Sequence, residues 1–233
     1  MLPGVLALLA ACSPQQWISR NMADALASQG AGDETDLELL RDAAPFQLKL
    51  SEAVLRQNPA HGPLAESVAA GFTQYTYAFV AFEAERLESR DARAADRLRQ
   101  RAARLYARAF RHARTALEQQ QPGLFARLAT PGAELALSPT QVGLAYWAAA
   151  AWVGWISLSK DEPEVVADLP AAARLLRLAW QVDPQWGNGA LTGLLASFEI
   201  ARPGGDARQA AAWFDQALRQ SDGQSVGAWL AKA

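Results

Sequence analysis

Runs of helix-forming residues separated by short glycine- and proline-containing segments are the feature that most limits the folds open to this chain. Beyond Trp17, alanine, leucine, arginine and glutamine dominate, and runs of β-branched residues are almost absent. The separating segments include GAGDETD at 30–36, NPAHGP at 58–63, DPQWGNG at 183–189 and RPGGD at 202–206. Because no stretch alternates apolar and polar residues as a strand does, we predict an all-α fold.

Two segments share an outline that suggests an internal repeat. LKLSEAVLRQNPAHG at 48–62 and ARLLRLAWQVDPQWG at 173–187 each read as an amphipathic helix that ends in Asn/Asp-Pro, two further residues and Gly. Small residues such as Ala53 and Ala179 would let paired helices approach closely. We therefore expect antiparallel helix pairs in a single-domain, tetratricopeptide-like helical-repeat superhelix.

Composition and charge exclude several classes of protein. With 233 residues the chain can build a core without disulfides, and its net charge of −2 lacks the basic surface of a nucleic-acid binder. His61 and His112 are the only histidines, and they lie in segments that indicate capping or surface roles. Phosphate-binding glycine motifs, HExxH and CxxC are absent. We predict no catalytic residues, metal site or cofactor, and hence no enzyme.

The single cysteine follows a short apolar run at the N-terminus. The sequence MLPGVLALLAACSPQQ places Leu9 three residues before Cys12, with small residues between them. This arrangement resembles a bacterial lipobox, in which a signal peptidase cuts before a cysteine that carries lipid. The run is too short to span a bilayer, and several acyl chains would give a stable anchor. The alternative is a buried N-terminal helix with an incidental cysteine.

This reading divides the chain into three parts. We predict a lipoprotein signal peptide at 1–11, a lipid-anchored segment with the first helix at 12–35, and a helical domain at 36–233 whose last helix continues past the end of the sequence. Ser13, rather than aspartate, follows Cys12, which favours the outer membrane as the site of attachment. Membrane contact would then come through the lipid alone.

The stretch LAYWAAAAWVGWISLS, Leu144 to Ser159, has no charge and contains four aromatic residues. Ser138 and Gln141 form a capping box at its start. A membrane span is disfavoured because no basic cluster flanks the stretch; Lys160 is followed by two acids. Two readings stay open, a helix buried in the core and a wall of an apolar channel lined by tryptophans.

A second aromatic stretch, GFTQYTYAFV at 71–80, begins a predicted helical stripe. Its members are Phe72, Tyr75, Phe79 and Phe82. The stripe is most simply core, whereas Thr73, Thr76 and Tyr77 would face a cavity or a partner.

These stretches and their neighbours resemble the T component of tripartite ATP-independent periplasmic (TRAP) transporters. The resemblance rests on DLELLRDAAPFQLKLSEAVLRQNPAH followed by GFTQYTYAFV, and on LAYWAAAAWVGWISLSKDEPEVVADLPAA followed by DPQWGNGALTGLLASFEIARPGGDARQAAAWFDQAL. It covers the chain from about Asp36 onward. It implies a periplasmic lipoprotein that forms a homotrimer and binds the solute-binding P component of the transporter.

The resemblance also implies an apolar channel for a hydrophobic or amphiphilic small molecule. The candidate channel residues, carried over by matching segment, are Tyr75, Tyr77, Tyr146, Trp147 and Trp155. The alternative function is a general envelope scaffold of helical repeats that mediates protein–protein interactions, which would offer a polar groove for peptides.

Overall fold

Several helices begin where a short polar side chain caps them. The Asp36 carboxylate accepts hydrogen bonds from the backbone N–H groups of Glu38 and Leu39, at 3.0 and 3.1 Å. Asp91 and Asp206 cap two later helices in the same way. Such caps satisfy backbone donors that have no partner within the helix. The acids and turns that punctuate the sequence therefore fix the starts of the helices.

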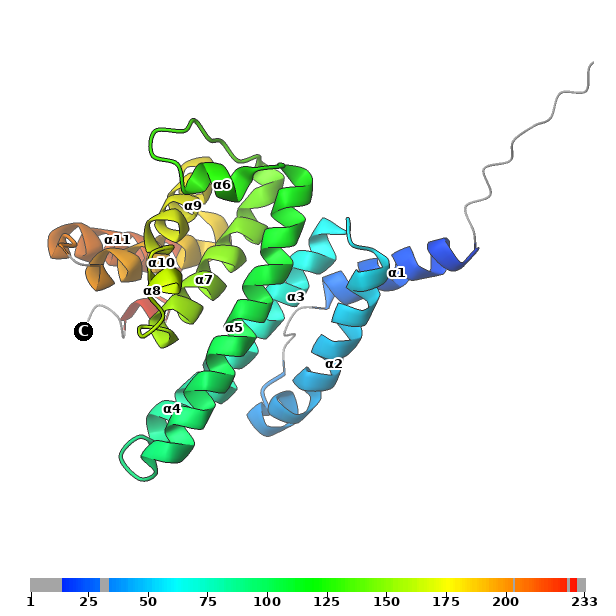
Figure 1. The fold of residues 1–233 in the computed structure, drawn as a ribbon, viewed down its shortest axis with the longest axis horizontal. Coiled ribbons are helices and arrows are strands. Elements are labelled where there is room, and N and C mark those ends of the chain that lie inside the picture. Colours follow the sequence, from blue (N-terminus) through cyan, green and yellow to red (C-terminus); the bar gives the residue numbers. More distant parts are fainter. Residues whose placement is uncertain (1–13, 30–33, 203, 226, 230–233) are drawn as a thin grey trace, which may run out of the picture.

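The computed structural model describes residues 14–29, 34–202, 204–225 and 227–229, and this part of the chain contains helices but no strand (Figure 1). The α-helices are α1 (Pro14–Ser28), α2 (Leu37–Gln57), α3 (Gly62–Tyr75), α4 (Phe82–Leu87), α5 (Ala92–Gln120), α6 (Leu124–Leu128), α7 (Val142–Leu158), α8 (Pro163–Val166), α9 (Leu169–Val182), α10 (Ala190–Ala201) and α11 (Ala207–Gln220). A π-helix, η1 (Thr76–Ala81), joins α3 to α4, and two 3-10 turns, η2 (Pro139–Gln141) and η3 (Trp186–Gly189), precede α7 and α10. The predicted all-α fold is confirmed, and it forms one domain.

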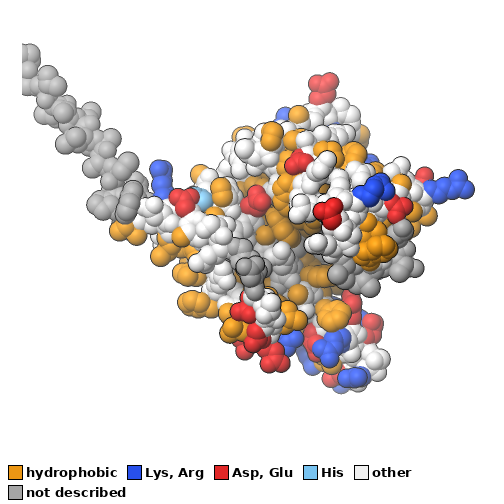
Figure 2. Space-filling model, turned by 180° about the vertical axis from the view of Figure 1, so that it is seen from behind, with side chains coloured by type: hydrophobic (Ala, Val, Ile, Leu, Met, Phe, Trp, Pro, Cys, Tyr) orange, Lys and Arg blue, Asp and Glu red, His pale blue; other side chains and the backbone are white. Residues whose placement is uncertain are grey.

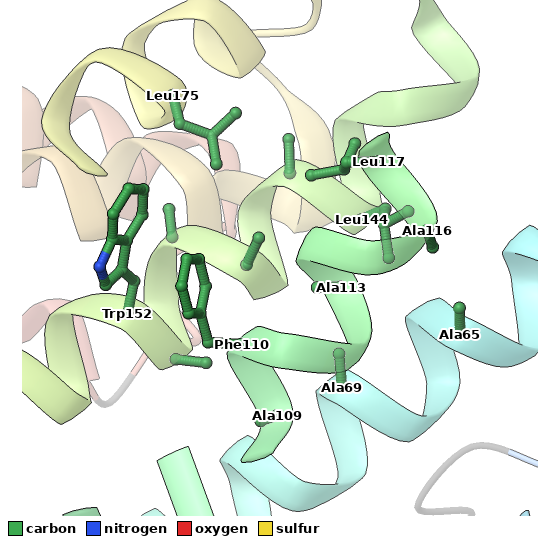
Figure 3. Close-up of a cluster of buried hydrophobic side chains, with 14 of the residues drawn as sticks. Ala65, Ala69, Ala109, Phe110, Ala113, Ala116, Leu117, Leu144, Trp152 and Leu175 are labelled. Atoms are coloured by element: carbon green, nitrogen blue, oxygen red, sulfur yellow. The ribbon is translucent and has the colours of Figure 1, made fainter. Parts of the chain in front are cut away.

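Helix α5 runs through the middle of the molecule between α3 and α7 (Figure 1). Alanines such as Ala109 and Ala113 keep the surfaces of α5 shallow, so that its neighbours approach closely (Figure 3). Phe110 of α5 stacks on Trp152 of α7 with ring centroids 4.4 Å apart, and both are buried. Replacing either ring by alanine would cost about 3–5 kcal/mol of folding free energy. This seam is the centre of the core.

The tryptophan-rich stretch forms α7, which is buried along most of its length. Its buried residues lie on several faces of the helix, as the all-round apolar sequence requires. Within the described residues, no helix is both long enough and apolar enough to cross a membrane. The predicted capping box at its start is present, with the Ser138 N–H donating to Gln141 Oε1 at 2.8 Å.

The predicted aromatic stripe in the 71–80 region is wrong beyond its first turn. Phe72 is buried, but Phe82 is 55% exposed. The π-helix η1 has a wider turn than an α-helix and therefore rotates later residues relative to the expected face. Thr76 and Val80 take the buried positions instead.

The two segments of the proposed repeat both end in a turn that leads into a contacting helix, α3 after α2 and α10 after α9. The turns themselves differ. His61 caps α3 by accepting from the Leu64 N–H at 3.0 Å, whereas Gly187 and Asn188 adopt left-handed backbone conformations before α10. The tetratricopeptide-like superhelix stays a prediction.

Candidate functional site

A cleft of about 1120 Å³ opens between α2, α3 and the start of α7. One face of α3 forms its floor. Residues on this face recur every three or four positions, and many of them are small, including Gly62, Ser67 and Ala70. The small side chains leave the space that a bulkier helix face would fill. The volume lies just above the range of about 300–1,000 Å³ that is usual for small-molecule sites.

Helix α2 forms the opposite wall, and only its second half is buried in the core; its first half contacts η1 through Arg41, whose guanidinium lies 5.6 Å from the centroid of the Phe79 ring. Its buried residues all lie between Leu48 and Leu55, whereas the described residues from Leu37 to Gln47 are half-buried or exposed. The helices come closest at Gly71, where a Cβ atom would lie 2.6 Å from Leu48 Cδ2. The cleft lies along the half of α2 that does not enter the core.

Three of the five aromatic residues predicted for the channel line this cleft. Tyr75 and Tyr77 come from the end of α3 and from η1, and Trp147 comes from α7. Tyr77 is 70% exposed and lies at the edge. The π-helix also brings Phe79 to the cleft, 5.5 Å from Tyr75 between ring centroids. The wide turn of the π-helix, which disrupts the predicted stripe, therefore places aromatic side chains on the side of the cleft.

The other two predicted aromatics are not among the described residues that line the cleft. The ring of Tyr146 packs against Trp147 and Trp186, with centroids 4.8 and 4.5 Å away, and burial raises the pKa of its hydroxyl. Trp155 packs beside Phe110 of the core, with centroids 6.3 Å apart. The tryptophan-rich helix is thus core on one side and cleft wall at Trp147.

The cleft contains one ionisable group that the sequence analysis did not single out. Glu66 lies on α3 and is the only charged side chain among the described residues lining the cleft. Its carboxylate fills the space beside Gly143 of α7, and it makes no hydrogen bond or ion pair with a described residue. Burial raises the pKa of this carboxyl. One feature of the sequence could have pointed to Glu66, because it is the only charged residue from 62 to 82.

A second polar cluster, which we call the Glu52 cluster, consists of Glu52 with Lys49, Arg56, Arg108 and His112. Glu52 is 4% exposed, and it receives a hydrogen bond from Arg108 Nε at 2.6 Å. Burial alone would raise its pKa, but the hydrogen bonds from Arg108, Lys49 and His112 outweigh it and lower the pKa to about 2. The cluster joins α2 to α5 and does not line the cleft.

His112 corrects a prediction from the sequence. We expected a surface or capping role, but the ring is half-buried, stacked near Phe72 and 2.9 Å from Glu52 Oε1. Burial lowers the pKa of the ring and outweighs the hydrogen bond to Glu52, which raises it. The partner lies 60 positions away in the sequence, which local pattern cannot reveal. His61 does cap a helix, as expected.

One further surface bears on function. Leu39, Phe46 and Leu50 form an exposed apolar strip on the outside of α2, with Phe46 75% exposed. Figure 2 shows hydrophobic side chains exposed on the surface of the molecule. Among the described residues, no group of histidine, cysteine, aspartate and glutamate side chains could hold a metal ion. The predicted lipid-bearing Cys12 lies outside the described residues.

Comparison with known proteins identifies one family and one relative. The sequence model of a family described as "TRAP transporter T-component" matches residues 33–233. A protein of Treponema pallidum (strain Nichols), named only "Uncharacterized protein", is 30% identical over 216 residues, which are 88% of this chain and 67% of the relative. The family match includes α2, α3, α5 and α7, which line the cleft. It begins after α1, whose Ala27 also lines the cleft.

Proposed function

Because this chain belongs to the TRAP transporter T-component family, we propose that it docks the transporter's solute-binding P component and offers its cleft to an apolar or amphiphilic ligand. Family membership itself implies an accessory role in a TRAP transporter, a transport role rather than catalysis, and an extracytoplasmic location. The ligand, the docking and the assembly are our proposals.

The cleft is the observation that carries the proposal. A cleft of about 1120 Å³ that opens to solvent is large enough to hold a small molecule. Its described lining combines aliphatic and aromatic side chains with scattered amides and hydroxyls. Pockets of this composition are typical of sites for small apolar ligands.

The apolar strip on α2, formed by Leu39, Phe46 and Leu50, supports the proposed homotrimer. Three large apolar side chains on one exposed helix face are costly to leave in water, and burial against a second copy would remove that cost. We further propose lipid attachment at Cys12, a periplasmic location and a tetratricopeptide-like arrangement of helix pairs.

Native mass spectrometry tests these proposals on the full chain with Cys12→Ala, mixed with the P component from the same genome. We expect a trimer that takes up the P component and carries an additional small-molecule mass. Phe46→Ser should reduce the trimer to monomer without unfolding it. A monomer that ignores the P component would support the envelope scaffold instead.

A matched pair of variants separates ligand binding from assembly. Ala70→Trp places an indole ring in the cleft and obstructs it, and Ala212→Trp places the same ring on an exposed part of α11. The first should lose the small-molecule mass and keep the trimer, and the second should keep both. Equal ligand retention in the two variants would show that the ligand does not occupy the cleft.

A further inference from the structure

The only charge on the described lining of the cleft is negative. Its described lining has a single carboxylate, Glu66, and contains no lysine, arginine or histidine; the guanidinium of Arg41 lies over the ring of Phe79, at the other end of the floor from Glu66. The carboxylate stands at the junction of α3 and α7, beside Gly143. A side chain at position 143 would collide with it, so the glycine makes room for the acid.

An ionised carboxylate in such a setting needs a counter-charge or hydrogen-bond donors. Desolvating a charge without a partner is costly; the buried acids Glu52 and Glu199 have Arg108 and Arg202 as partners, whereas Glu66 is half-buried. Glu66 has no such partner among the described residues. An anionic ligand would add a second negative charge to this end of the cleft. A cationic group on the ligand would supply the counter-charge that the described residues do not give Glu66.

Aromatic rings that can attract a cation also line the cleft. Trp147 lies one helical turn beyond Gly143 and also lines the cleft. An ammonium group between a carboxylate and an indole face gains both ion pairing and cation–π attraction. From Glu66 to Phe79 the floor extends roughly 20 Å, at the rise of a helix, which accommodates an alkyl chain.

We propose that the cleft binds a cationic amphiphile, whose amine or quaternary ammonium group pairs with Glu66 beside Trp147 and whose apolar chain extends toward Tyr75 and Phe79. This inference rests on the proposed function, in which the cleft holds an apolar ligand. It adds the chemical class of that ligand. It also assigns Glu66 as the residue that selects against anionic amphiphiles.

Isothermal titration calorimetry on the full chain with Cys12→Ala provides the test, with each probe kept below its micellar concentration. The probes share a chain length and differ in head group: dodecyltrimethylammonium, dodecyl sulfate, dodecyl maltoside and dodecylphosphocholine. The variants are Glu66→Gln and, as a matched control, Glu164→Gln, which removes an exposed carboxylate from α8. Urea unfolding of each variant verifies that it folds.

Dodecyltrimethylammonium should bind the parent and the Glu164→Gln control equally, and Glu66→Gln about ten- to hundredfold more weakly. The maltoside should not distinguish the variants, and the sulfate should bind the parent most weakly. Glu66-dependent binding of the phosphocholine as well would identify a lipid head group as a source of the ammonium.

Two results would count against the inference in different ways. If all probes bind Glu66→Gln and the parent equally, the cleft holds apolar chains without reading their charge, and only this inference falls. If no probe binds the parent, the cleft is not an amphiphile site, and the ligand part of the proposed function falls with it.

Discussion

Replacing Glu52 by glutamine should destabilise the protein far more than its small change in shape suggests. Glutamine resembles the protonated acid, so the variant mimics neutral Glu52 at every pH. The fall in the pKa of Glu52 from 4.5 to about 2 corresponds to about 3 kcal/mol of folding free energy at pH 7. Because Lys49 and Arg56 are 56% and 65% exposed, water screens part of this. We expect a loss of about 2–3 kcal/mol.

Urea unfolding followed by circular dichroism measures this loss directly. A loss of that size lowers the midpoint by about 1 M. The control is Glu83→Gln, which removes a carboxylate paired with Arg86 at 3.1 Å on the surface of α4. Such pairs contribute less than about 0.5 kcal/mol.

The pH dependence gives a second, independent measurement of the same quantity. A carboxyl whose pKa is lowered by folding contributes its stability above the unfolded value of 4.5, and this contribution is lost as the pH falls toward about 2. The gap between the parent and Glu52→Gln should therefore narrow between pH 5 and pH 3. Equal midpoints for the Glu52 and Glu83 variants, or a gap that does not change with pH, would refute the reasoning.

Two other substitutions test the turn before α10 and the floor of the cleft. Gly189 has φ +88, and a Cβ there would lie 2.7 Å from the Ala217 carbonyl, whereas Gly204 has φ +70 and open space around it. Gly204→Ala should cost about 1 kcal/mol in urea unfolding, and Gly189→Ala about 1–3 kcal/mol more, because of the clash; similar costs would contradict the close contact between η3 and α11. Burial raises the pKa of Glu66 above its value of 4.5 in the unfolded chain. Ionisation of this carboxyl therefore lowers the stability of the folded protein as the pH rises above 4.5. Glu66→Gln should therefore be more stable than the parent at pH 7 and equal to it below pH 4.5, and a variant less stable at pH 7 would show that Glu66 has a stabilising partner.

Local sequence patterns predicted the helices and their ends well, because the information for both is local. The capping box of Ser138 and Gln141 and the cap at His61 need only residues three positions apart. The burial of α7 follows equally from a stretch with no charge. In each case one segment carries the whole signal.

The cleft could not be predicted in the same way, since it depends on how distant segments meet. Trp147 and Trp152 look alike in sequence, yet one lines the cleft and the other stacks on Phe110. The π-helix, which brings Phe79 to the cleft, has no clear marker in the sequence. Glu66 had a local signal, its isolation among uncharged residues, but its importance appears only when the cleft surrounds it.

The burial of only one half of α2 in the core has a consequence for how the family can diversify. Residues from Leu37 to Gln47 contribute to the cleft wall but bury nothing in the core, while Leu48 to Leu55 secure the helix. Mutations in the first half can change the width and lining of the site with little effect on the folding equilibrium. Selection for a new ligand would then meet little resistance from the requirement to stay folded, so that half is where relatives with different specificities should differ most.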